Sequence, residues 1–135
     1  MDQPNADIGA TTWVIADGYI PPTSSGPEPA MTSHDSVCML NAGDAPADVE
    51  LLIYLTDAEP LGPYRVRIGP RRAFHQRLND LDDPGPVPVD TDYCCVIRSS
   101  APIVVQHTRL DSRQAANALM TTIAHPVTNQ AGHAR

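Results

Sequence analysis

Fourteen prolines divide this chain of 135 residues into short apolar segments. Proline fixes its own φ angle and has no N–H to donate, so it interrupts helices and is confined to turns and edges in sheets. The apolar segments are rich in β-branched residues, as in Ile103 to Val105. This pattern predicts an all-β fold with structured loops rather than a helical bundle.

Turn-forming residues separate the segments at short intervals, which is typical of an antiparallel β-sandwich or jelly roll. We expect about eight strands, at residues 11–16, within 31–42, and at 48–56, 64–68, 71–78, 93–98, 102–111 and 119–124. The DAEPLGP segment at 57–63 contains Gly and two Pro and predicts a hairpin. Residues 112–120 remain open between helix and strand, because good helix formers run into a threonine pair. We expect a single domain at 11–125 with flexible ends at 1–10 and 126–135.

The segment from Pro102 to Arg113 begins as an apolar strand and ends in polar side chains. Because side chains alternate along a strand, His107, Arg109 and Asp111 share one face with Val105. Burying an imidazole, a guanidinium and a carboxylate is costly unless they pair with one another, with a partner subunit or with a ligand. The segment therefore indicates either an internal Arg–Asp network, a polar ligand site or a subunit interface.

The net charge is −7, and every Lys or Arg position is Arg. An acidic chain is a poor candidate for tight binding to nucleic acid or anionic membranes, which need a basic surface. No segment is long and apolar enough to span a bilayer, and the acidic N-terminus lacks an apolar signal core, so we expect a cytoplasmic protein. Three cysteines without a spacing pattern indicate reduced thiols.

Long segments of the chain resemble the sensory rhodopsin transducer family. They are WVIADGYIPPTSSGPEP, SHDSVCMLNAGD, DAEPLGPYRV, NDLDDP, DTDY and PIVVQHTRLDSRQAANALMTTIA, spread over residues 12–125. The resemblance implies an antiparallel β-sandwich of jelly-roll type that assembles as a homotetramer. It also implies a partner, a membrane rhodopsin or another receptor, and a small polar ligand such as a sugar.

A site for a polar ligand needs an aromatic face together with planar donors and acceptors. The candidate ligand-binding residues, all inside the matched segments, are Trp13, Glu28, His34, Asn41, His107, Arg109, Asp111 and Arg113. Trp13 also fits a place in the core, and Asn41 before Ala42-Gly43 also fits an Asx turn. Arg109 and Arg113 also fit ion pairs at a subunit interface.

The sequence favours a non-enzymatic signalling and binding module, with no catalytic residue, metal ligand or cofactor predicted. One alternative is a DNA-binding regulator, whose basic face would come from Arg65, Arg67, Arg71, Arg72 and Arg77. A less favoured alternative is a metal-dependent jelly-roll enzyme that uses His34, His75 and His107. No HxH or HxxxH pair and no motif around a Ser or Cys nucleophile supports it.

Overall fold

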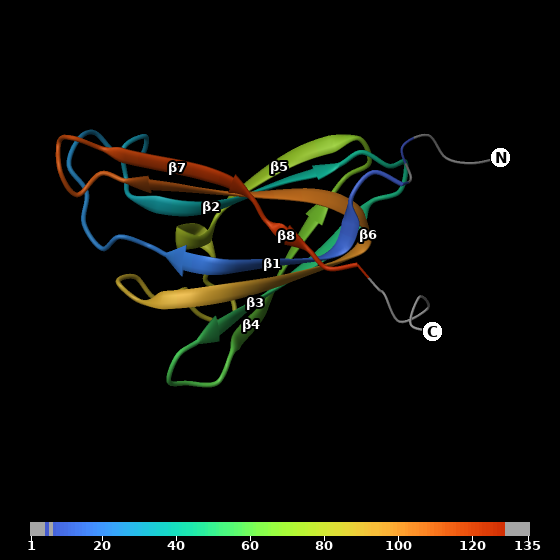
Figure 1. Cartoon of the computed structure of the whole chain (residues 1–135), viewed down its shortest axis with the longest axis horizontal. Helices are drawn as coiled ribbons and strands as arrows, with labels where there is room; N and C mark the ends of the chain where they lie inside the picture. The colour runs from blue at the N-terminus through green and yellow to red at the C-terminus, as the bar shows by residue number, and fades with distance from the viewer. Residues whose placement is uncertain (1–4, 6, 129–135) are drawn as a thin grey trace.

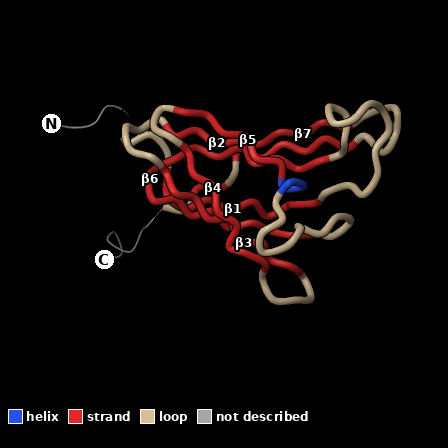
Figure 2. Tube along the Cα trace, turned by 180° about the vertical axis from the view of Figure 1, so that it is seen from behind, coloured by secondary structure: helices blue, strands red, loops and turns tan. Residues whose placement is uncertain are grey.

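The computed structural model describes residue 5 and residues 7–128. The strands are β1 (Ala10–Tyr19), β2 (His34–Asn41), β3 (Ala47–Leu55), β4 (Leu61–Ile68), β5 (Arg72–Arg77), β6 (Asp92–Asp111), β7 (Ala118–Ile123) and β8 (His125–Pro126). A 3-10 turn, η1 (Leu78–Asp80), follows β5 and lies between the two layers of strands (Figure 2). Strands β3 and β4 form the predicted hairpin.

Strand β6 belongs to both layers, because it curves from one to the other (Figure 1). Its first half lies in sheet A, in the order β4-β3-β6-β1-β8, and its second half lies in sheet B, between β2 and β7, with β5 beyond β2. The sequence predicted two strands here, and the structure joins them. Pro102 falls between the pairing of Ser99 with Val49 and that of Val104 with Leu40. Its missing N–H therefore costs no ladder hydrogen bond.

The core lies between the two sheets and is built by alternation along each strand. On β3, for example, Val49, Leu51 and Ile53 are buried while Glu50 and Tyr54 are not. The inward residues of the other strands join them in one hydrophobic cluster. Each fully buried aliphatic side chain contributes about 1.5–3 kcal/mol relative to an exposed one. The all-β sandwich predicted from the sequence is confirmed.

The structure also settles the segment that the sequence left open. Residues 112–117 form a turn and Ala118–Ile123 form strand β7, which pairs with the end of β6. The predicted flexible ends lie mostly outside the described residues. Of the residues predicted to be flexible that the structure describes, Ala10 begins β1 and Pro126 pairs with Trp13 as part of β8.

Two further observations concern membranes and thiols. In the part of the chain that the structure describes, no helix has the length and hydropathy to cross a bilayer. The three cysteines Cys38, Cys94 and Cys95 are free thiols.

Candidate functional site: a polar cluster at one end of the sandwich

A buried carboxylate, Asp35, lies beneath the candidate site. Alternation along β2 turns Asp35 inward on the same face as Val37 and Met39, and its side chain is 0% exposed. A carboxylate in this position needs partners for all of its lone pairs, because an unpaired buried charge costs several kcal/mol.

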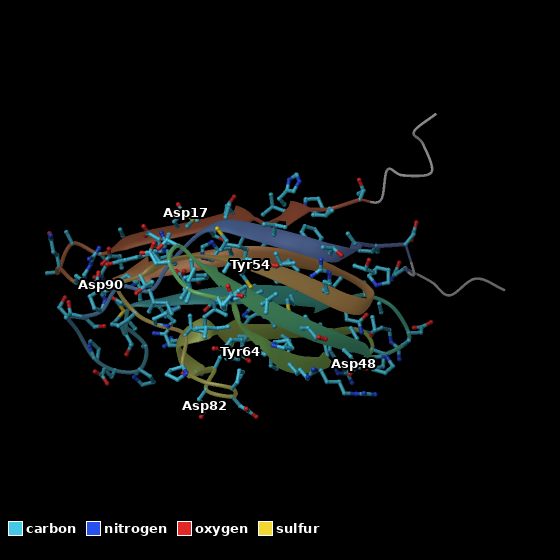
Figure 3. All side chains as sticks on the ribbon, turned by 90° about the horizontal axis from the view of Figure 1, so that it is seen from below. Asp17, Asp48, Tyr54, Tyr64, Asp82 and Asp90 are labelled. Atoms are coloured by element: carbon cyan, nitrogen blue, oxygen red, sulfur yellow. The ribbon has the colours of Figure 1, made fainter. Side chains whose placement is uncertain are left out.

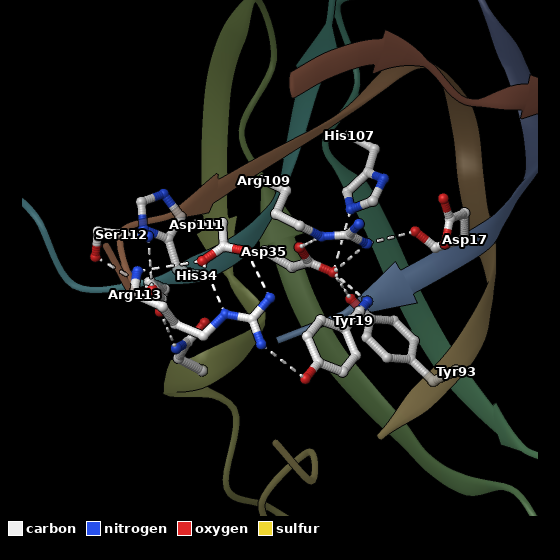
Figure 4. A network of polar contacts seen from close by, with 12 residues as sticks. Asp17, Tyr19, His34, Asp35, Tyr93, His107, Arg109, Asp111, Ser112 and Arg113 are labelled. Carbon is white, nitrogen blue, oxygen red and sulfur yellow. Dashed lines mark hydrogen bonds and ion pairs between the residues drawn. The ribbon is translucent and has the colours of Figure 1, made fainter. Parts of the chain in front are cut away.

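Three residues donate hydrogen bonds to the Asp35 carboxylate (Figure 4). The Tyr93 hydroxyl donates to Oδ2 at 2.6 Å, and the Tyr19 backbone N–H donates to the same oxygen at 2.8 Å. Arg109 Nε donates to Oδ1 at 2.8 Å. The Arg109 guanidinium also donates to the Asp17 carbonyl oxygen at 2.6 Å. These contacts join β1, β2 and both halves of β6 at one end of the sandwich.

The His107 imidazole lies beside this carboxylate. Its side chain is 2% exposed, and Nε2 is 3.3 Å from Asp35 Oδ2. The contact lacks the alignment of a hydrogen bond, so Nε2 has no hydrogen-bond partner among residues 7–128. His107 thus lies against the carboxylate and shares the buried end of the sandwich with it.

The environment decides the charge of each member of the cluster. Burial alone would raise the pKa of Asp35, but His107 and the hydrogen bonds from Arg109, Tyr93 and Tyr19 outweigh it and hold the pKa below its usual value. Burial and the neighbouring Asp35 charge raise the pKa of Tyr93 well above its usual range. Asp35 is thus ionised and Tyr93 neutral at physiological pH.

Above the buried cluster lies a set of half-buried and exposed polar side chains, which we call the rim: Tyr19, Asp90, Asp111 and Arg113. Arg113 holds Asp111 through two side-chain hydrogen bonds, Nε to Oδ1 at 3.0 Å and Nη2 to Oδ2 at 2.7 Å. Its guanidinium carbon also lies 5.5 Å from the Tyr19 ring centroid. The Tyr19 hydroxyl donates to Asp90. Hydrogen bonds from Arg113 lower the pKa of Asp111, so this carboxylate is ionised.

Ser112 lies between Asp111 and Arg113 and holds the proline-rich loop at residues 20–33 in place. Its backbone N–H donates to Ser33 Oγ at 3.0 Å, and its hydroxyl donates to the Met31 carbonyl oxygen. Its carbonyl oxygen accepts from the backbone N–H of Ser25 at 2.6 Å and from the Ser25 hydroxyl at 2.8 Å. Ser33 and Ser112 are both buried. The loop is thus coupled directly to the segment that carries Asp111 and Arg113.

The structure brings together four of the eight predicted site residues: His107, Arg109, Asp111 and Arg113. His34 lies at the same end, as the Cα partner of Leu110, and its Nδ1 is 2.7 Å from the Thr32 carbonyl oxygen.

The other three predicted residues lie apart from this cluster. Trp13 is 4% exposed in the core, and its indole N–H donates to the carbonyl oxygens of Ala10 and Ile103. Asn41 is buried at the far end of β2, where it bonds the Ala45 carbonyl oxygen and accepts from Gly43 N–H. Glu28 is exposed on the proline-rich loop.

Sequence reasoning missed Asp35, Tyr93 and Asp90 as parts of the site. A signal for Asp35 was present, since it lies two residues before Val37 and four before Met39 and so shares their buried face. Tyr93 shares a face with Cys95 and Ile97 in the same way. No sequence signal joins Tyr19 to Asp90, because their contact spans 71 positions.

The structure also places the residues that would serve the two alternative functions, a DNA-binding regulator and a metal-dependent enzyme. Arg67 pairs at 3.0 Å with Asp48, which is labelled in Figure 3, and Arg65 lies 3.9 Å from Glu50. Arg71 pairs with Asp44, so three of the five arginines of the supposed basic face have acidic partners. Within the described residues, no group of three or more His, Cys, Asp or Glu side chains could hold a metal ion.

The comparisons with known proteins agree with this architecture. A family model described as Anabaena sensory rhodopsin transducer matches residues 8–126, which is most of the chain. The chain belongs to this family. A solved structure named Anabaena sensory rhodopsin transducer is 59% identical, with a TM-score of 0.69, and the match covers 75% of this chain and 97% of that one.

A second member of this structural group is more distant in sequence. The crystal structure of Thermotoga maritima 1070 is 34% identical, with a TM-score of 0.79, and the match covers 88% of this chain and 96% of that chain. No curated protein matches this chain. The transducer family match therefore rests on the family model and the solved structures, and it supports a transducer-like module.

Proposed function

We propose that this transducer-family chain is a non-enzymatic signalling module that binds a small polar metabolite, such as a sugar, at the rim and relays the state of a receptor. The observation that carries the proposal is the rim itself. Tyr19, Asp111 and Arg113 present an aromatic ring, a carboxylate and a guanidinium on a base that Asp35 holds rigid. These are the group types that recognise hydroxyl-rich ligands.

The space beside the rim suits a ligand of this size. A polar cleft of about 470 Å³ is lined by Asp111, Arg113, Gln114, Ala116 and Ala118. Small-molecule sites commonly have volumes of about 300–1,000 Å³. The lining contains a carboxylate, a guanidinium and an amide, which together donate to and accept from ligand hydroxyls.

The link through Ser112 offers a route for the signal. A ligand that repositions Arg113 also acts on the neighbouring residue, whose backbone and hydroxyl hold Ser25, Met31 and Ser33. The proline-rich loop would then change its contacts with a partner while the two sheets stay unchanged. The ligand shifts this equilibrium only as far as its affinity differs between the two loop arrangements.

The test is a thermal-shift screen of the whole chain against sugars, sugar acids and common metabolites. A ligand at about 100 times its dissociation constant should add about 2.7 kcal/mol of stability. Arg113→Ala should abolish the shift. The matched control is Arg67→Ala, which also removes an exposed arginine paired with an aspartate and should leave the shift intact. A shift that survives Arg113→Ala, or no shift across the panel, would remove the rim as the ligand site.

We further propose that the chain acts in the cytoplasm as a homotetramer with a receptor partner, such as a membrane rhodopsin. The name of the 59% identical structure supports the partner, since it is described as a sensory rhodopsin transducer. Light scattering should give about four times the chain mass of 14.5 kDa. A mass that stays at 14.5 kDa at micromolar concentration would rule the tetramer out.

A further inference from the structure

Strand β7 leaves one of its two edges without a neighbouring strand. Among residues 7–128 it pairs only with β6, in an unbroken register along its whole length. Its other edge therefore presents a row of backbone N–H and C=O groups with no strand beside it. Such a row is a template on which another strand can pair, so native proteins usually protect it with charge, proline or a bulge.

The other outer strands of this sandwich carry that protection. Strand β5, the opposite edge of sheet B, begins and ends with arginine. Strand β4, one edge of sheet A, contains Pro63, Arg65 and Arg67. Strand β8, the other edge of sheet A, is two residues long and ends in Pro126. The β7 sequence ALMTTI has no charged residue and no proline, and no bulge interrupts its register with β6. An unprotected edge among protected ones indicates that β7 meets another strand.

The side chains that flank this edge on the outer face of sheet B are mostly apolar. Residues directly opposite one another share a face of the sheet, and Thr122 lies opposite the buried His107, so Thr122 is on the inner face. Leu119, Thr121 and Ile123 therefore project from the outer face. Leu119 is 73% exposed and Ile123 55%, the two highest values among the exposed large hydrophobic residues that the structure describes.

The order of these three residues selects a second copy of the same strand as the partner. In antiparallel pairing about a two-fold axis at Thr121, Leu119 of each copy lies opposite Ile123 of the other. An axis at Met120 would set Leu119 against Thr121 and leave Ile123 beyond the paired segment. A register shifted by one residue would turn the second sheet over. The Thr121 hydroxyl is already hydrogen-bonded to the Thr108 hydroxyl at 3.0 Å, so the axis buries no unpaired hydroxyl.

We propose that two copies of this chain join through β7, antiparallel about a two-fold axis at Thr121, into one continuous sheet in the order β5-β2-β6-β7-β7-β6-β2-β5. The inference rests on the self-association proposed above and names its contact, so that a homotetramer contains two of these pairs. Two copies of a chain with a net charge of −7 repel one another, and β7 supplies an uncharged edge at which they can meet. The contact is isologous, because the same surface serves on both copies.

The experiment measures mass by analytical ultracentrifugation over a dilution series of the whole chain. Leu119→Lys sets a charge against Ile123 at two points of the contact, and Ile123→Glu sets one against Leu119. Each variant should move dissociation into half-size assemblies to a concentration at least about 100-fold higher. The double variant Leu119→Lys/Ile123→Glu should recover most of that loss, because each new lysine then lies opposite the new glutamate of the other copy.

The matched control is Leu40→Lys, which changes an exposed leucine on the outer face of sheet B but on β2, between β5 and β6. It should leave the dilution curve unchanged. Circular dichroism checks that every variant keeps the native fold. Single variants that dissociate like the native chain, or a double variant as weak as the single ones, would overturn the inference.

The same measurement separates this contact from the tetramer proposed above. A native tetramer whose mass none of these variants changes would keep the tetramer and refute the β7 contact. A native mass of two chains, reduced to one chain by Leu119→Lys, would refute the tetramer and support the β7 contact. A native chain that stays at 14.5 kDa would refute both.

Discussion

The sharpest test of the polar cluster is Asp35→Asn, which keeps the side chain's shape and removes its charge. In the native chain, Oδ2 accepts from Tyr93 and from the Tyr19 N–H, and Oδ1 accepts from Arg109. Asparagine has one oxygen. If that oxygen takes the Oδ2 position, the amide NH₂ faces the Arg109 Nε–H, and two donors meet.

The magnitude follows from what is lost. One charge-assisted hydrogen bond contributes about 1.5–3 kcal/mol. Arg109, whose side chain is 17% exposed, also loses its buried counter-ion, although it keeps the Asp17 carbonyl oxygen. Breaking a buried pair typically costs about 3–5 kcal/mol, and the partial exposure of Arg109 places this case near 3 kcal/mol. For a chain of this length, the melting temperature should fall by about 10–15 °C.

The assay is urea unfolding at fixed protein concentration, followed by circular dichroism. The matched control is Asp48→Asn, which removes the same charge from an exposed pair with Arg67 and should cost less than about 1 kcal/mol. If Asp35→Asn also costs less than about 1 kcal/mol, the buried carboxylate does not hold this end of the sandwich, and the reasoning fails.

The comparison of the native chain with Asp35→Asn also predicts how stability depends on pH. The pKa of Asp35 is lower in the folded chain than in the unfolded chain. Its contribution to stability is therefore fully present above the unfolded value of about 3.9 and is lost as the pH falls toward the folded value. The stability difference between the native chain and Asp35→Asn should shrink as the pH falls below about 4. A difference that stays constant from pH 6 to pH 3 would contradict the lowered pKa.

Three further predictions test the packing. Gly18→Ala should cost about 1–3 kcal/mol in urea unfolding, because the added Cβ would lie 2.3 Å from the Tyr93 ring, whereas Gly85→Ala, with open space around it, should change stability by less than about 0.5 kcal/mol. Burial raises the pKa of Cys95 to about 12, so at pH 8 this thiol should react with a thiol reagent only on unfolding. Fast labelling of Cys95 itself in the native chain, located by peptide mass, would contradict its burial. Trp13 is 4% exposed, so its fluorescence should resist acrylamide until the chain unfolds, and efficient quenching of the native chain would place it outside the core.

Local pattern was enough for much of the fold. The prolines and β-branched segments predicted a sandwich of about eight strands, and alternation along the end of β6 placed His107 and Arg109 on the inner face. Strand identity depends on neighbouring residues along the chain, so the sequence carries it directly. The resemblance to the transducer family was likewise readable from long segments of residues, and the family model confirms it.

What the sequence could not supply was pairing between distant positions. Asp35 meets Arg109 across 74 positions and Tyr93 across 58, and only the crossing of β6 between the sheets brings all three together. Trp13 and Asn41 looked like ligand groups by residue type, but burial and backbone carbonyl partners decide what they contact. The sequence by itself determined which side chains point inward. Only the tertiary structure decided which of them meet, because those contacts depend on the packing of the two sheets.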